Sequence, residues 1–207
     1  MVENALLLDY LLFVIFPLWI VTGLTDYALH RRTRIEENAG TRESLLHAMQ
    51  LGEVGVPILF ALFFDVNALI FSIMLAGLLL HEITALWDLT YASTRRYVSP
   101  LEQHVHSFME VLPLTALLFM SLMYWGQFSA LFGFGAEPAR FALQVKPQPI
   151  PPPYLVMLFF CVGGFVVLPY AEELWRCLRA AARSRVGDDA KHMLRPSRAA
   201  RRAGGCG

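Results

Sequence analysis

The sequence ALIFSIMLAGLLLHEITALWDLTY, residues 68–91, decides the fold of this chain. It is apolar along most of its length and longer than the ~20 residues that an α-helix needs to cross a bilayer. It also contains His81 and Asp88, which are seven residues apart and therefore lie on one helix face, two turns apart. A polar stripe on such a helix must face other helices or a water-filled pocket. The stretch therefore predicts a transmembrane helix whose polar face is turned toward a bundle.

Four further apolar segments lie at residues 6–30, 44–64, 100–125 and 154–178. Of the 207 residues, 56% are hydrophobic and only 16% are charged, which is typical of integral membrane proteins. We therefore expect an all-α polytopic bundle of about five transmembrane helices over residues 1–180, followed by a flexible basic tail over residues 181–207. The first segment has no basic region before it and no cleavage site after it, so we expect a retained helix and not a signal peptide.

The basic residues are distributed unequally between the two ends of these segments. Fifteen of the 17 lysines and arginines lie in the connections at residues 31–43 and 92–99 or after residue 175. Arg140 and Lys146 alone lie at the opposite end. The positive-inside rule then places the N-terminus outside and the tail in the cytoplasm. We expect an integral protein of a bacterial inner membrane.

Histidines and carboxylates collect toward the cytoplasmic ends of four segments. A carboxylate in lipid is costly, and a metal ion is a suitable partner for a mixed set of imidazoles and acids. Asp26 and His30 are four residues apart, as are His106 and Glu110, so each pair shares a helix face. We predict a metal site on the cytoplasmic side of the bundle, formed by Asp26, His30, His47, Glu53, His81, Asp88, His104, His106 and Glu110.

Some of these residues, and the acids near them, also have simpler interpretations. Asp26, His30 and His104 would be satisfied by water at the membrane surface, and His81 by one hydrogen bond between helices. Other acids have structural interpretations: Glu43 suits the positive end of a helix dipole, and Ser99-Pro100-Leu101-Glu102 matches a capping box. Either Glu172 or Glu173 could face the site, but an ion pair with Arg176 is the simpler interpretation.

The donor set indicates which metal the site would bind. Nitrogen and oxygen ligands without thiolates suit iron or manganese better than copper. The three cysteines have no spacing typical of a zinc site or a disulfide framework. Helical bundles with inward-facing glutamates and histidines are known to hold two irons, and the ligands here are numerous enough for two ions. We therefore expect two iron ions, with manganese as the other metal that fits.

The chain distantly resembles the membrane-bound diiron oxygenases, the group of fatty-acid desaturases and hydroxylases. The likeness covers about residues 20–110 and rests on Asp26-Tyr-Ala-Leu-His30, His81-Glu82, His104-Val-His106 and Glu110. The HxxxH and HxxHH boxes of that group are absent here. The resemblance implies oxygen activation and oxidation of a lipid-soluble substrate, with electrons from a separate donor. It also implies ligation by the predicted histidines and acids.

Two other functions are compatible with the same residues. A haem-binding electron-transfer subunit would use His47 with His106, or His30 with His81, as axial pairs, although haem would not need the carboxylates. An ion or proton transporter would use the acids as a relay, although the opposite half of the bundle offers no matching polar path. The basic tail is expected to contact anionic lipid and not nucleic acid. The sequence leaves the oligomeric state open.

Overall fold

The computed structural model describes residues 2–147 and 149–193, and these residues form an all-α bundle. Five of its helical segments are long and apolar enough to cross a membrane, which confirms the predicted fold class and an integral membrane protein. The segments are listed here in chain order: α1 (Val2–Tyr10), η1 (Leu11–Ile15) and α2 (Phe16–Thr33); α3 (Gly40–Phe63); α4 (Ala68–Arg95); α5 (Pro100–Met123); and α7 (Pro152–Val162), η3 (Gly163–Val167) and α8 (Leu168–Met193).

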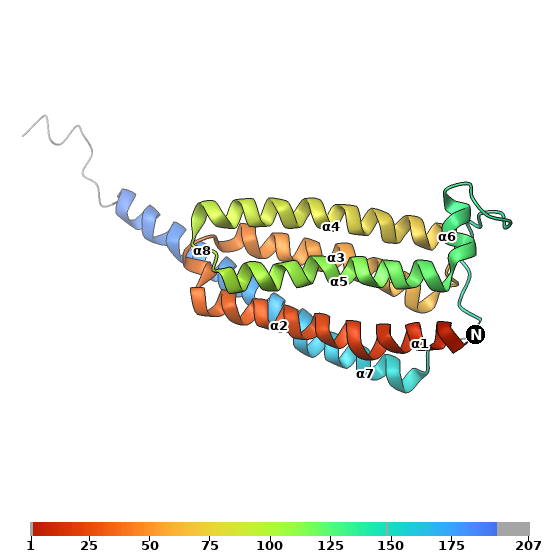
Figure 1. Cartoon of the computed structure of the whole chain (residues 1–207). Helices are drawn as coiled ribbons and strands as arrows, with labels where there is room; N and C mark the ends of the chain where they lie inside the picture. Colours follow the sequence, from red (N-terminus) through yellow and green to blue (C-terminus); the bar gives the residue numbers. More distant parts are fainter. Residues whose placement is uncertain (1, 148, 194–207) are drawn as a thin grey trace, which may run out of the picture.

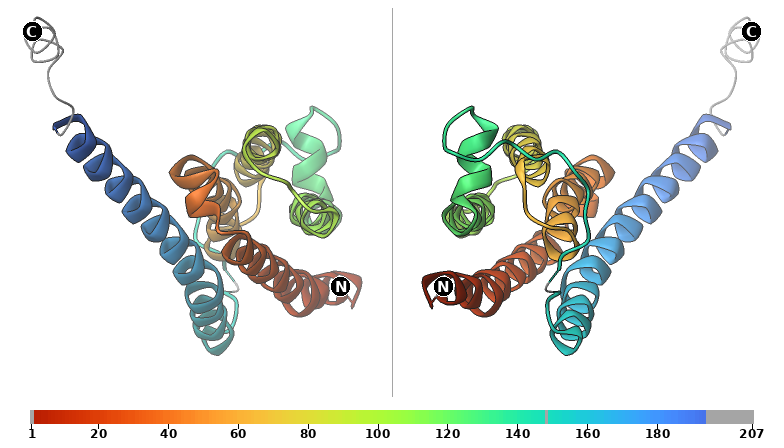
Figure 2. Two further views of the ribbon diagram at one scale, coloured as in Figure 1. Left: turned by 90° about the vertical axis from the view of Figure 1, so that its left-hand side faces the viewer. Right: turned by 90° about the vertical axis from the view of Figure 1, so that its right-hand side faces the viewer.

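The helices α2, α3, α4 and α5 run side by side along the long axis of the molecule (Figure 1). The α7–η3–α8 segment lies along α2 and α3, and α8 leaves the bundle at its C-terminal end (Figure 2). Two short elements complete the described fold: the 3₁₀ turn η2 (Ile35–Glu37) and the helix α6 (Trp125–Leu131). They lie at opposite ends of the bundle (Figure 1).

Side-chain caps explain where two of the long helices begin. The Asn67 side chain accepts hydrogen bonds from the backbone N–H groups of Leu69 (3.0 Å) and Ile70 (3.4 Å) at the start of α4. Ser99 accepts one from the backbone N–H of Glu102 (3.2 Å), and Pro100 occupies the first position of α5. Such caps satisfy amide groups that have no partner inside the helix.

The closest packing in the bundle joins α3 to α4. Gly77 on α4 lies so close to α3 that an added Cβ would be 2.5 Å from the Glu53 carbonyl oxygen and 2.5 Å from Pro57 Cγ. This contact fixes the depth of α4 relative to α3. It therefore also fixes the depth of the polar side chains farther along α4.

Two elements differ from the sequence expectation. The last helix does not end near residue 178 but continues to Met193. Residues 179–186 hold several alanines and arginines, which favour a helix even outside an apolar span. Residues 125–131 form the short helix α6, which lies between two predicted spans and was not expected. The rest of the predicted tail, residues 194–207, lies outside the described residues.

Candidate metal centre

Three helices each carry an acid followed four residues later by a histidine. The pairs are Asp26–His30 on α2, Glu43–His47 on α3 and Glu102–His106 on α5. A spacing of four residues places both side chains on one helix face, and in the structure all three faces turn toward the same point inside the bundle. Asp88 from α4 and Glu173 from α8 reach this point as well. We call these eight residues the carboxylate–histidine cluster.

One half of the cluster gathers around His30 Nε2. This nitrogen lies 3.4 Å from Asp26 Oδ1 and 3.3 Å from Glu102 Oε1, and Asp26 Oδ1 lies 2.9 Å from His106 Nε2. One donor atom from each of these four residues lies within 4.8 Å of the other three. The four donors come from two helices, α2 and α5, and form a compact set of two nitrogens and two oxygens.

The other half of the cluster gathers around His47. Its Nε2 atom lies 3.0 Å from Asp88 Oδ2, and its ring stacks on that of His30 with centroids 4.6 Å apart. Glu43 lies between the two halves, with Oε1 3.9 Å from His30 Nε2. Donor atoms of His30, Glu43 and His47 again lie within 4.8 Å of one another. The two groups share His30, so the cluster offers two overlapping sets of ligand atoms.

Glu173 connects the two stacked imidazoles. Its Oε2 atom lies 3.1 Å from His30 Nδ1 and its Oε1 atom 2.9 Å from His47 Nδ1. Because a carboxylate accepts hydrogen bonds, this arrangement assigns the Nδ1 proton to both rings. Each Nε2 atom then faces carboxylate oxygens, and neither has a hydrogen-bond partner of good geometry among the described residues. A carboxylate that holds Nδ1–H while Nε2 binds a metal is the usual support of a metal-ligating histidine.

Arg96 closes the cluster at its outer edge. Its Nε atom lies 3.2 Å from both carboxylate oxygens of Glu43, and its Nη1 atom lies 3.0 Å from Glu102 Oε2. Burial lowers the pKa of the guanidinium, but these carboxylates outweigh the burial and raise the Arg96 pKa above its ordinary value. Arg96 therefore stays charged and holds Glu43 and Glu102 in place.

The charges of the cluster are not balanced by Arg96 alone. Its five carboxylates are all buried, with exposed fractions between 0% and 4%. Among the described residues, Arg96 is the one arginine or lysine that forms an ion pair with any of them. With neutral histidines, four negative charges remain without a cation, and such a charge is costly inside a protein.

The structure brings five of the nine predicted ligands into this cluster: Asp26, His30, His47, Asp88 and His106. His104 does not join them, because its exposed ring turns away and packs against Phe108 with centroids 5.1 Å apart. Glu53, His81 and Glu110 lie deeper along their helices and are absent from both groups of closely spaced donors among the described residues.

The deeper residues have their own surroundings. Glu53 Oε1 accepts a hydrogen bond from the Thr84 hydroxyl at 2.8 Å. His81 is buried, and within the described part of the chain neither of its ring nitrogens has a hydrogen-bond partner. His81 and Glu110 line the same cavity as part of the cluster. They are placed to contact a ligand in that cavity.

The predicted ligand set left out three acids of the cluster: Glu43, Glu102 and Glu173. Glu43 and Glu102 do lie in first helical turns, but their side chains turn inward to Arg96. The expected pairing with Arg176 is made by Glu172 at 3.4 Å and by Glu36, which leaves Glu173 free for the imidazoles. The repeat of the acid–histidine spacing on three helices was the signal that could have found Glu43 and Glu102.

A cavity of about 360 Å³ opens beside the cluster. Asp26, His47, Asp88 and His106 line its polar end, and the rest of its wall is mostly apolar. Tyr170 stands at this end, with its hydroxyl 3.1 Å from Asp26 Oδ2 and 3.2 Å from the Gly23 carbonyl oxygen. The cluster therefore faces an internal apolar space.

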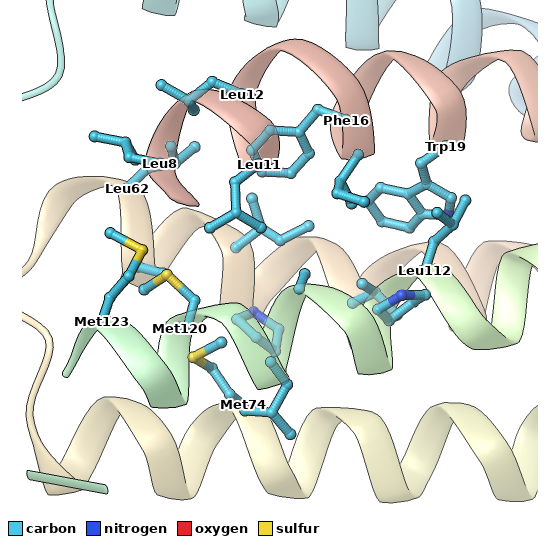
Figure 3. A pocket seen from close by; sticks show the side chains of 18 of the residues that line it. Leu8, Leu11, Leu12, Phe16, Trp19, Leu62, Met74, Leu112, Met120 and Met123 are labelled. Atoms are coloured by element: carbon cyan, nitrogen blue, oxygen red, sulfur yellow. The ribbon is translucent and has the colours of Figure 1, made fainter. Parts of the chain in front are cut away.

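A second, narrower cavity of about 100 Å³ adjoins the first toward the opposite end of the bundle. Leucine, methionine and aromatic side chains, among them Leu11, Trp19 and Met120, surround it (Figure 3). Phe16, Trp19, Ile58 and Leu62 line both cavities. The two spaces thus share one wall.

Comparison of the chain with models of known families, with curated proteins and with solved structures finds no match.

Proposed function

We propose that this integral membrane protein binds two iron ions, or two manganese ions, in the carboxylate–histidine cluster. We further propose that it uses them to oxidise a lipid-soluble substrate, with dioxygen as oxidant and a separate electron donor. The observation that carries the proposal is the pair of buried imidazole Nε2 atoms, on His30 and His47, that face carboxylate oxygens without a hydrogen-bond partner.

The charge of the cluster supports two divalent ions. Five buried carboxylates and one arginine leave four negative charges when the histidines are neutral. Two divalent cations neutralise this excess, and they do so without placing a proton on each of two stacked rings 4.6 Å apart. Protonated rings at that distance would repel each other, because charges interact strongly in a buried site.

The donor types support iron or manganese. The cluster offers imidazole nitrogens and carboxylate oxygens, and no cysteine belongs to either donor group of the described residues. Such mixed nitrogen and oxygen sites suit iron and manganese, and bundles of antiparallel helices hold pairs of these ions with the same residue types. The resemblance to membrane diiron oxygenases points to the same metal.

The apolar cavity supports a lipid-soluble substrate. In an oxygenase reaction a C–H bond is replaced by C–OH, the second oxygen atom leaves as water, and the donor supplies two electrons with two protons. Bound iron would supply the activation of dioxygen. The cavity would hold the substrate next to the cluster and exclude water. Tyr170, hydrogen-bonded to Asp26, would fix the orientation of that carboxylate.

The two other functions receive less support from the geometry. Haem requires open space on both faces of a flat ring, whereas His47 is stacked on His30 and lies 3.0 Å from a carboxylate oxygen of Asp88. A transporter requires polar groups along the whole path. The adjoining cavity toward the other end of the bundle is instead lined mainly by leucine, methionine and aromatic residues.

The distribution of basic residues supports a location for the cluster. Most of the lysines and arginines among the described residues lie at the end of the bundle where the cluster is found. We propose that this end faces the cytoplasm of a bacterial cell, and that the protein lies in the inner membrane with its N-terminus outside.

Two histidines on one helix provide the test. His106→Ala removes a donor of the cluster, and we expect bound metal to fall by at least half and oxidation activity to disappear. His104→Ala is the matched control, since His104 is exposed on the same helix two residues away, and it should retain both. Equal metal content and equal activity in the two variants would contradict the proposed centre.

A further inference from the structure

The end of the bundle far from the cluster holds a cation placed at the mouth of an apolar cavity. Lys146 lies in the loop between α6 and α7 and lines the narrow cavity, together with Tyr124 and Ile150. The loop is fixed to the adjacent helix end, because the Lys146 N–H donates to the Phe63 carbonyl at 2.9 Å and the Asp65 N–H to the Gln144 carbonyl at 2.7 Å. The position of this ammonium group is therefore set by the fold.

The Lys146 ammonium group has donor capacity to spare. One hydrogen bond, of 2.8 Å, goes to the Ala61 carbonyl oxygen near the end of α3. The nearby carboxylate, Asp65, is paired with Arg140 instead, at 3.1 Å. A lysine has three N–H donors, so up to two are unused by the described residues and remain for a ligand. Burial lowers the pKa of Lys146, because it disfavours the charged ammonium group. An anion bound beside the ammonium group would favour the charged form and offset this effect.

The two cavities behind Lys146 share apolar lining residues, and placed end to end they define a path from Lys146 to the cluster. Leu8, Met74 and Leu117 line the narrow cavity, which reaches down to Glu53 and Trp19. The wider cavity shares a wall with it and continues to the carboxylate–histidine cluster. From Ala61 to His47 the path follows fourteen residues of α3, or ~21 Å. This length exceeds the ~15 Å of one leaflet's hydrocarbon, so a ligand that fills the path must have a long chain.

We propose that these cavities bind a single-chain amphiphile with an anionic head group. Its head contacts Lys146, its chain runs through the two adjoining cavities, and the free end of its chain meets the cluster. A carboxylate and a phosphate monoester share the head-group chemistry that an ammonium group recognises. Oxidation of the chain at its free end rests on the proposed function. Binding of the amphiphile in the two cavities does not depend on metal.

The simpler interpretation of Lys146 is that it caps α3. A lysine near a helix C-terminus can bond to the last carbonyl groups and interact favourably with the helix dipole. A cap of this kind would stabilise the fold but would not distinguish a fatty acid from a fatty alcohol. The comparison of these two ligands therefore separates the interpretations.

Binding of tritiated palmitate to the full-length protein in phosphatidylcholine nanodiscs tests the proposal. We expect one saturable site per chain and competition by unlabelled palmitate at least tenfold stronger than by hexadecanol. Hexadecyl phosphate as competitor identifies the head group: competition equal to that of palmitate supports a site for either anion, and weaker competition supports a carboxylate site. Equal competition by palmitate and hexadecanol would show a helix cap only and overturn the proposal.

Three variants refine the test. Lys146→Gln should weaken palmitate binding roughly tenfold, because it removes a charge-assisted hydrogen bond. Ala61→Trp should abolish binding by filling the narrow cavity, which Ala61 lines. Gln144→Ala is the matched control, since Gln144 is exposed in the same loop and lines neither of these two cavities. Unchanged palmitate binding in both Lys146→Gln and Ala61→Trp would overturn the proposal.

Metal content measured on the same samples keeps this proposal separate from the proposed function. Metal bound without palmitate would overturn the amphiphile site and leave the metal centre standing. Palmitate bound with the expected preference but without metal would support the amphiphile site and contradict the metal centre.

Discussion

At the scale of single residues, Glu173 is the side chain that orients the two stacked imidazoles. Glu173→Gln keeps the size of the side chain but leaves one Nδ1–H facing an amide N–H₂ group instead of an oxygen. Loss of such a supporting carboxylate typically lowers metal affinity 10- to 100-fold, and we expect a loss in this range, measured by competition with a chelator. Glu172→Gln is the matched control, because Glu172 is partly exposed and bonds to Tyr27 and Arg31. Equal affinities in the two variants would rule out this role for Glu173.

Arg96 gives a prediction about the stability of the fold and not about metal affinity. Its side chain is 4% exposed and pairs with two buried carboxylates. Arg96→Gln leaves both acids without their permanent cation, and removing one partner of a buried ion pair costs about 3–5 kcal/mol. We expect a lower melting temperature in detergent, with partial recovery when Fe²⁺ or Mn²⁺ is added. Arg95→Gln, at an exposed neighbouring position, should melt like the unaltered protein; a similar loss in both variants would contradict the prediction.

The same residues explain why the sequence predicted only part of the site. Asp26, His47 and Asp88 could be predicted because a polar group in an apolar segment needs an inward partner. Glu102 could not, because an acid three residues after a serine also forms a capping box, and only the structure shows its side chain turned to Arg96. Glu173 lies next to Glu172, and sequence spacing does not decide which of two adjacent acids faces inward.

At the scale of helices, the contact between α3 and α4 determines how the deeper polar residues meet. Gly77→Ala places a Cβ atom 2.5 Å from the Glu53 carbonyl oxygen, so the helices must separate. We expect a loss of about 1–3 kcal/mol in unfolding free energy, the usual cost of overpacking. Gly52→Ala is the control, since nothing lies within 4 Å of its added Cβ, and it should be neutral or stabilising by about 0.5–1 kcal/mol. Denaturant titration measures both, and equal stability would contradict the close packing.

Helix lengths show the same limit of sequence patterns. The five spans could be predicted because a helix that crosses a bilayer needs a run of about 20 apolar residues. Such long apolar runs are rare in other kinds of helix. The extension of α8 to Met193 could not, since the sequence after residue 178 has no run of apolar residues long enough to mark a span. The helix α6 was missed because seven residues between turns give too short a pattern to distinguish a helix from a loop.

At the scale of the whole molecule, the placement of basic residues predicts the orientation in the membrane. In a background free of the natural cysteines, Ala136→Cys after α6 should react with an impermeant maleimide in intact cells. Tyr97→Cys, in the exposed loop between α4 and α5, should react only after the inner membrane is permeabilised. The reverse pattern of labelling would place the carboxylate–histidine cluster at the outer face and contradict the proposed orientation.

The central claim is that eight side chains from five helices hold two metal ions. The most direct measurement is the metal content of the purified full-length protein, by inductively coupled plasma mass spectrometry together with an optical spectrum. We predict two ions of iron or manganese per chain, no Soret band, and a loss of at least one ion in Glu102→Gln. A chain that retains no first-row transition metal after incubation with Fe²⁺ and Mn²⁺, or one that shows a Soret band, would contradict the claim.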